Sequence, residues 1–100
     1  MNVGYSKSFI KAVEKLSGKQ LESVRSVIKE VKDAQRLEDI TNCKRLVGYN
    51  AVYRIRIGAY RAFFTFHVEI VDDTLVFQYL VSRGQAYAKK VEKELKRLDR

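Results

Sequence analysis

The sequence predicts an α+β fold, in which an N-terminal αα-hairpin packs on a small antiparallel β-sheet meander and a C-terminal helix follows. Apolar residues recur with helical spacing before residue 36 and after residue 84, whereas between Cys43 and Ser82 they alternate with a period of two. The strand-like segments follow each other through short connections, which favours antiparallel pairing with the helices against one face. The length of 100 residues predicts a single domain over residues 1–100.

The N-terminal part is predicted to form a short edge strand and two helices. Residues 2–5 suit the strand, and Ser6 is a good N-cap for the first helix. Gly18 marks the turn into a second helix over residues 19–35. The apolar stripes are Phe9, Ile10, Val13 and Leu16 in the first helix, and Leu21, Val24, Val27, Ile28 and Val31 in the second. These stripes predict a helical hairpin that covers one side of the sheet.

Four more strands are predicted over residues 44–48, 51–57, 60–70 and 74–82, with Asp72-Asp73 as the last turn. The strand over 60–70 presents Tyr60, Ala62, Phe64, Phe66 and Val68 on one face, and Arg61, Phe63, Thr65 and His67 on the other. The strand over 74–82 presents Leu75, Phe77, Tyr79 and Val81 on the core face. From residue 85 the pattern is helical again, with Val91, Leu95 and Leu98 on one stripe.

A cationic hairpin is the main functional feature of the sequence. By strand parity, Arg54 and Arg56 share one face, opposite an apolar face. A two-residue turn at Gly58-Ala59 places Arg56 directly across from Arg61, and like charges in that position destabilise a sheet. An anion bound between them would compensate for this cost. The like-charge pairing predicts that Arg61→Leu leaves the fold intact or stabilises it slightly.

Two further residues extend this cationic group. The expected register places residue 84 opposite Arg61, so Arg83 is predicted to lie close to the hairpin arginines. Arginine clusters bind phosphates through paired hydrogen bonds and can stabilise a pentacovalent transition state. The alternative is a solvated basic face or a site for an acidic partner. Tyr87 is either a proton-transfer and base-stacking group or a core tyrosine four residues before Val91.

The net charge and the few cysteine and histidine residues favour some kinds of partner and exclude several kinds of catalytic site. The net charge of +8 favours polyanionic or acidic protein partners. The single cysteine, Cys43, excludes an internal disulfide, and one histidine, His67, leaves no histidine pair for acid–base catalysis. Neither metal-ligand spacing nor a Gly-rich phosphate loop is present, so we expect no metal and no cofactor. No segment resembles a signal peptide or a membrane span, and we expect a cytoplasmic protein without membrane contacts.

Three segments, together with the helical hairpin, resemble one known family. They are Cys43 to Gly48 (CKRLVG), Tyr53 to Phe64 (YRIRIGAYRAFF) and Leu80 to Tyr87 (LVSRGQAY). Their order and content resemble the RelE/ParE superfamily of bacterial toxins from toxin–antitoxin modules, and the resemblance extends over nearly the whole chain. It implies a RelE-like fold and a cognate antitoxin as partner.

The resemblance favours the RelE branch, because Tyr87 follows Arg83 by four residues. RelE-like toxins enter the ribosomal A site and cut mRNA there, using the 2′-hydroxyl as nucleophile. The resemblance implies that Arg54 and Arg56 bind RNA phosphates, and that Arg61 and Arg83 stabilise charge at the reacting phosphate. It also implies that Tyr87 orients or deprotonates the nucleophile. The expected partners are then mRNA and the ribosome as well as the antitoxin.

Two alternatives stay open from the sequence. A ParE-like toxin would act on DNA gyrase without nuclease chemistry, and a non-catalytic module would only bind an antitoxin or RNA. One departure from the family pattern bears on activity, since many relatives carry histidine where this chain has Ser82. The substitution removes a candidate acid–base group from the end of the last strand.

Overall fold

The computed structural model of this protein describes residues 1–67 and 74–99. In this part of the chain, five strands form one mixed sheet in the order β1-β5-β4-β3-β2. The strands are β1 (Asn2–Tyr5), β2 (Cys43–Arg45), β3 (Val52–Ile57), β4 (Tyr60–His67) and β5 (Thr74–Ser82). The helices are α1 (Lys7–Glu14), α2 (Gly18–Asp33) and α3 (Lys89–Leu98), with short 3-10 helices η1 (Leu37–Asp39) and η2 (Arg83–Gln85). The predicted α+β architecture is confirmed.

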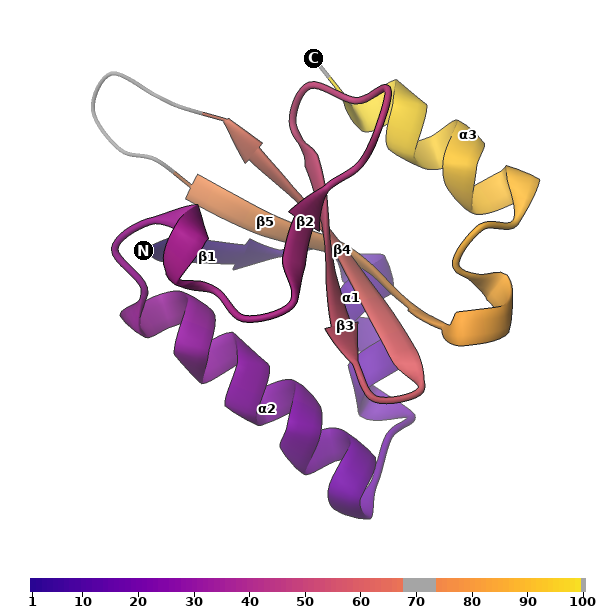
Figure 1. Cartoon of the computed structure of the whole chain (residues 1–100). Coiled ribbons are helices and arrows are strands. Elements are labelled where there is room, and N and C mark those ends of the chain that lie inside the picture. The colour runs from indigo at the N-terminus through magenta and orange to yellow at the C-terminus, as the bar shows by residue number, and fades with distance from the viewer. Residues whose placement is uncertain (68–73, 100) are drawn as a thin grey trace.

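The strand pairing agrees with the predicted meander, with one addition. Strands β2 to β5 pair antiparallel with their chain neighbours, but β1 pairs with β5 in parallel. The sheet is therefore mixed rather than purely antiparallel. The parallel contact arises because the α1–α2 hairpin follows β1 and lies on one face of the sheet before the chain enters the meander (Figure 1).

Some boundaries differ from the expected ones. Strand β2 ends at Arg45 rather than at residue 48, and α3 begins at Lys89, after η2 and a short connection, rather than at residue 85. The predicted turn at Asp72-Asp73 lies outside the described residues, as do residues 68–70 of the predicted strand over 60–70. No helix in residues 1–67 and 74–99 is both long and apolar enough to cross a bilayer.

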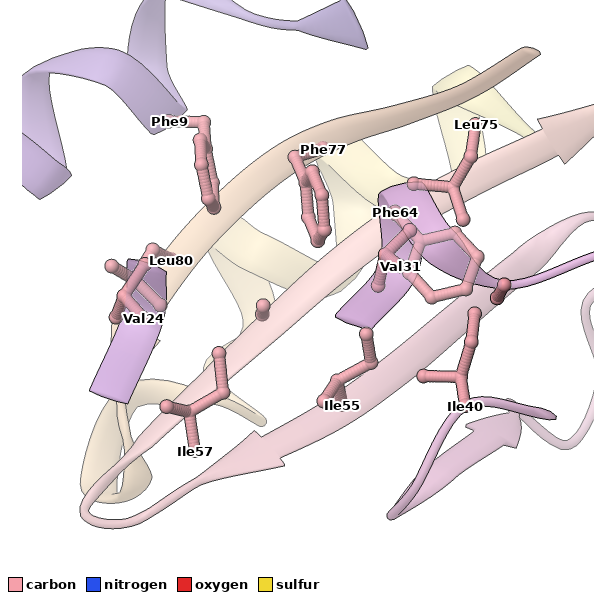
Figure 2. Packing of buried hydrophobic residues seen from close by; sticks show 12 residues of the cluster. Phe9, Val24, Val31, Ile40, Ile55, Ile57, Phe64, Leu75, Phe77 and Leu80 are labelled. Carbon is pink, nitrogen blue, oxygen red and sulfur yellow. The ribbon is translucent and has the colours of Figure 1, made fainter. Parts of the chain in front are cut away.

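The sheet carries a hydrophobic cluster on each face. The α1–α2 side holds the larger cluster, in which the rings of Phe9 and Phe77 stack at 4.9 Å and Phe64 meets Phe77 edge to face (Figure 2). The α3 side holds a smaller cluster, whose buried members are Val52, Phe63, Ala86 and Leu95. Figure 1 shows α3 on the opposite side of the sheet from α1 and α2. The prediction that helices cover one face therefore describes the hairpin but not α3.

A β-bulge in β5 exchanges the two faces of that strand. Phe64 pairs with Phe77 and Phe63 pairs with Tyr79, so Gln78 has no partner in the register. One extra residue inverts the alternation of all side chains beyond it. Leu75, Phe77 and Leu80 consequently belong to the α1–α2 cluster, whereas Tyr79 and Val81 pack on the α3 side. The prediction that Tyr79 and Val81 share the face of Phe77 was wrong for this reason.

Ser6 joins the first helix to this bulge. Its Oγ accepts a hydrogen bond from the Phe9 amide at 3.0 Å, which confirms the predicted N-cap. The same hydroxyl donates to the Gln78 carbonyl at 2.6 Å. One side chain therefore satisfies both an amide at the start of α1 and a carbonyl of the bulge.

We expect Ser6→Ala to destabilise the fold by about 1–3 kcal/mol, since it removes the cap and leaves the Gln78 carbonyl without its donor. Urea unfolding followed by circular dichroism measures this change. Ser8→Ala is the matched control, because Ser8 is an exposed residue of the same helix. Equal stability of the two variants would show that the Ser6 hydroxyl does not hold the bulge.

Candidate functional site

The predicted register of the central hairpin is confirmed. Arg56 pairs with Arg61 and Ile57 with Tyr60, across a turn that includes Gly58 at a φ of 57°. Glycine adopts such a left-handed conformation without steric cost. Arg54, Arg56 and Arg61 project to the α3 side of the sheet. The residues next to them in their strands, Ile55, Ile57 and Ala62, belong to the cluster on the α1–α2 side. The candidate site therefore lies on the face that α3 partly covers.

Arg61 is not exposed, contrary to the expectation for a phosphate-binding residue. Only 7% of the residue is accessible. Its Nη1 donates to the carbonyl oxygens of Gly58 at 3.0 Å and of Tyr60 at 2.8 Å. The guanidinium thus binds the backbone of the β3–β4 turn, while Arg56 opposite is exposed. Hydrogen bonds from a charged donor to two carbonyls offset the like-charge pairing.

These contacts reverse the stability expected of an Arg61 variant. We expect Arg61→Leu to destabilise the protein by about 1–3 kcal/mol, because two turn carbonyls lose a charged donor in a largely buried setting. Chemical denaturation measures the difference. Arg56→Leu is the control, since it removes the facing charge from an exposed position, and its effect should stay within about 0.5 kcal/mol. A stability gain for Arg61→Leu would indicate that repulsion outweighs the turn contacts.

Arg83 reaches the same turn through its backbone. The register of β4 and β5 pairs Arg61 with Val81, so the expected position of residue 84 opposite Arg61 was wrong. Instead, the Arg83 amide donates to the Ala59 carbonyl at 2.8 Å. The carbonyls of residues 58, 59 and 60 are therefore all engaged, two by Arg61 and one by Arg83. Arg83 is exposed, at the end of β5 beside the hairpin turn.

Tyr87 is a surface residue, with 64% of it accessible. It lies before the start of α3 and next to Ala86, which is buried in the α3-side cluster and anchors this connection. Arg54 Nη1 donates to the Tyr87 hydroxyl oxygen at 2.9 Å. The alternative of a core tyrosine on the last helix was wrong, and the structure brings two of the predicted site residues into direct contact.

Lys44 is a site residue that the sequence reasoning did not select. It pairs directly with Arg54 across β2 and β3 and so lies on the same face of the sheet. The two side chains line one cavity, together with Tyr87. The alternation of side chains along the predicted strand gives the face on which Lys44 lies relative to its strand neighbours. Only the register between β2 and β3 places Lys44 opposite Arg54. Lys44, Arg54 and Tyr87 form a cationic and aromatic group beside α3.

The loop between β2 and β3 fastens α3 over this face. The Asp99 carboxylate accepts hydrogen bonds from the backbone amides of Asn50 and Ala51, at 2.7 to 3.1 Å. Lys96 Nζ donates to the Gly48 carbonyl at 2.7 Å and lies 4.1 Å from the ring centre of Tyr49. The helix is thus held at its C-terminal end by polar and cation–π contacts.

Cys43 has the environment of an inert thiol. Burial of the thiol raises its pKa to about 11. The positive charge of Arg54 lowers this pKa by a smaller amount, and the Glu30 carboxylate raises it further. The thiolate is the reactive form of cysteine, and a raised pKa keeps the sulfur protonated at neutral pH. Cys43 therefore lacks the activation that a nucleophile needs.

We expect alkylation of Cys43 by iodoacetamide at pH 8 to be about a hundredfold slower in the folded protein than in the same protein unfolded in urea. The reason is that a pKa near 11 rather than 9.0 lowers the thiolate fraction by about two powers of ten. The folded rate should still rise between pH 9 and pH 10. Equal rates in both states at pH 8 would contradict the raised pKa.

Comparison with known proteins supplies the family. Toxin RelE3 of Methanocaldococcus jannaschii is 30% identical over 88 residues, which are 87% of this chain and 96% of the relative. No family model matches the chain.

Solved structures agree with this relationship. A chain of the RelB–RelE antitoxin–toxin complex from Methanococcus jannaschii superposes with a TM-score of 0.68 and 26% identity, over 84% of this chain and 94% of that one. The isolated RelE toxin of E. coli has a TM-score of 0.65 and 18% identity, over 97% of both chains. The second comparison supports the fold alone, because its identity is low.

Proposed function

The chain belongs to the RelE family of toxins from toxin–antitoxin systems, and from this premise we propose that it is a ribosome-dependent endonuclease that cuts mRNA in the A site. The observation that carries the proposal is the contact between Arg54 and Tyr87 on a cationic face, with Arg83 exposed at the end of β5. This combination offers a hydroxyl group held in place and several charges suited to phosphates.

The proposed reaction is transesterification within the RNA. The 2′-oxygen of one nucleotide attacks the adjacent phosphorus, and the bond from phosphorus to the 5′-oxygen of the next nucleotide breaks. The products are a 2′,3′-cyclic phosphate and a 5′-hydroxyl end. The 2′-hydroxyl loses a proton and the leaving 5′-oxygen gains one, so the step needs no other reactant.

We assign the site residues to separate tasks in this reaction. Tyr87 orients the 2′-hydroxyl or, as the phenolate, accepts its proton, with its own position held by Arg54. Arg54 and Arg56 bind backbone phosphates, and Arg83 stabilises the charge that develops at the reacting phosphate or leaving oxygen. Arg61 acts indirectly, since its guanidinium braces the turn whose Ala59 carbonyl accepts the Arg83 amide. Ser82 is exposed where many relatives carry histidine, so proton transfer depends on Tyr87.

We also propose a cognate antitoxin as the protein partner. Relatives of known structure were solved as RelB–RelE complexes from Methanococcus jannaschii and Pyrococcus horikoshii. The net charge of +8 favours acidic stretches in such a partner and steers association with the ribosome. Ribosome binding should therefore weaken as the salt concentration rises.

The decisive test is primer extension on an mRNA translated in a cell-free system with added protein. We expect cuts that appear only during translation. Arg83→Ala should lower the cleavage rate by roughly 10²–10³-fold, because it removes a charge that stabilises the transition state. Tyr87→Phe should lower it by roughly 10²–10⁴-fold, because the hydroxyl is the proposed proton-transfer group.

Arg25→Ala is the control for loss of charge alone, since Arg25 is exposed on α2 and takes no part in the site. It should cut at the wild-type rate. Intact mRNA with normal translation would overturn the proposal, and a DNA gyrase supercoiling assay would then test the ParE-like alternative. Intact mRNA with stalled translation would instead identify a ribosome-binding protein without the chemistry.

A further inference from the structure

A cavity of about 360 Å³ lies where β2, β3 and the loop between them meet α3. Glu92 lines this cavity from the first turn of α3. Lys96 lies one turn further along the same face of the helix, where it contacts the Gly48 carbonyl and the ring of Tyr49. This face of α3 is therefore turned toward the β2–β3 loop, and Glu92 is an acidic residue on the wall of the candidate site.

The Glu92 carboxylate has no hydrogen bond and no ion pair within the part of the chain that the structure describes. Glu94 differs in this respect, because it binds Arg97 at 2.7 Å and the Tyr79 hydroxyl at 3.3 Å. Burial raises the pKa of the Tyr49 hydroxyl, and the Glu92 carboxylate raises it further, which agrees with a position of that charge near Tyr49 on the cavity wall. Glu92 thus offers a carboxylate to the site that is not used in a structural ion pair.

The other charged and titratable groups on the cavity wall are cationic or phenolic. They are Lys44 and Arg45 from β2, Arg54 from β3, Tyr49 from the loop, and Tyr87. Cations beside a carboxylate allow a phosphate to approach it, because they offset the repulsion between the two negative charges. Arg54 also holds the Tyr87 hydroxyl at 2.9 Å. One cavity therefore brings together a carboxylate, a fixed hydroxyl group and charges suited to a phosphate.

A carboxylate is better suited than a phenol to accept a proton at neutral pH. Carboxyl groups ordinarily carry their negative charge there, whereas phenols ordinarily keep their proton and must lose it first. The transesterification proposed above needs an acceptor for the 2′-hydroxyl proton. Ser82 supplies no imidazole for this task at the end of β5.

We propose that Glu92 is the general base of RNA cleavage and that Tyr87 orients the 2′-hydroxyl toward it. This inference rests on the proposed nuclease function. The 2′-hydroxyl proton passes to the Glu92 carboxylate while the bond between the 2′-oxygen and phosphorus forms and the bond from phosphorus to the 5′-oxygen breaks. The leaving 5′-oxygen takes a proton from water, and Glu92 returns its proton to the resulting hydroxide.

The pH dependence of cleavage tests this assignment. The rate is measured under single turnover, with the chain in excess over ribosomes that hold an mRNA codon in an open A site. Carboxylate bases stay ionised from about pH 6 to about pH 8, so we expect a nearly constant wild-type rate over this range. With a phenolate as the base, the rate would rise about tenfold per pH unit, and that result would overturn the assignment to Glu92.

Glu92→Gln should lower the single-turnover rate at pH 7 at least a hundredfold, and the residual rate should rise with pH because the remaining bases ionise only at higher pH. The concentration of chain that gives half the maximal rate should stay the same or fall, since the variant removes a negative charge from a cationic surface. Glu92→Asp keeps the carboxylate and should keep the constant profile at a reduced rate. Wild-type cleavage by Glu92→Gln would overturn the assignment of the base and leave the nuclease intact.

Two controls separate catalysis from structure. An acidic residue in the first turn also stabilises a helix through its macrodipole, so urea unfolding of Glu92→Gln is measured beside its rate. Glu22→Gln removes an exposed carboxylate of α2 and should cleave at the wild-type rate. A slow Glu92→Gln variant that keeps the constant pH profile would identify a structural residue and overturn the proposal. Absence of cleavage by the wild-type chain would overturn the nuclease and this inference with it.

Discussion

The pairing of β3 with β4 is the constraint on which the rest of this structure depends. This hairpin contributes side chains to the hydrophobic clusters on both faces of the sheet. Its register places Arg56 opposite Arg61, an arrangement that repels unless one of the charges has a partner. Arg61 finds that partner in the turn itself, since its guanidinium binds the Gly58 and Tyr60 carbonyls. The Ala59 carbonyl of the same turn accepts a hydrogen bond from the Arg83 amide and so fixes the end of β5.

The two faces of the sheet are used differently. The α1–α2 side holds the larger cluster with its stacked aromatic rings, which gives the fold most of its buried apolar surface. The α3 side buries fewer apolar residues and depends more on polar contacts, such as those of Asp99 and Lys96 with the β2–β3 loop. A looser face of this kind leaves room for a cavity and for a half-buried arginine. The chemistry that we propose is located there.

Much of the fold and part of the site could be predicted from local patterns. The Ser6 cap and the Arg56–Arg61 register each depend on a few neighbouring residues, and the structure confirms them. Most of the two helical stripes packs in the core as predicted, but Ile10 is exposed and Leu21 lies outside the cluster. The shared face of the hairpin arginines follows from parity alone. The depth of Arg61 could not be predicted, because parity gives the side of a sheet but not the neighbours that cover it. The expected register of β4 and β5 was wrong by three residues, because Val81 rather than Gly84 pairs with Arg61.

The sequence by itself therefore determined the α+β class, the hairpin and the set of charged residues on one face, because periodicity and tight turns act over a few residues. Only the tertiary structure decided which of those residues are accessible. The bulge at Gln78 inverts half of β5, and the Gln78 carbonyl accepts a hydrogen bond from the Ser6 hydroxyl, which is 72 positions away in the chain. The cavity beside Arg54 likewise forms where β2, β3 and α3 meet. Such contacts join distant segments, and no local pattern in the chain records them.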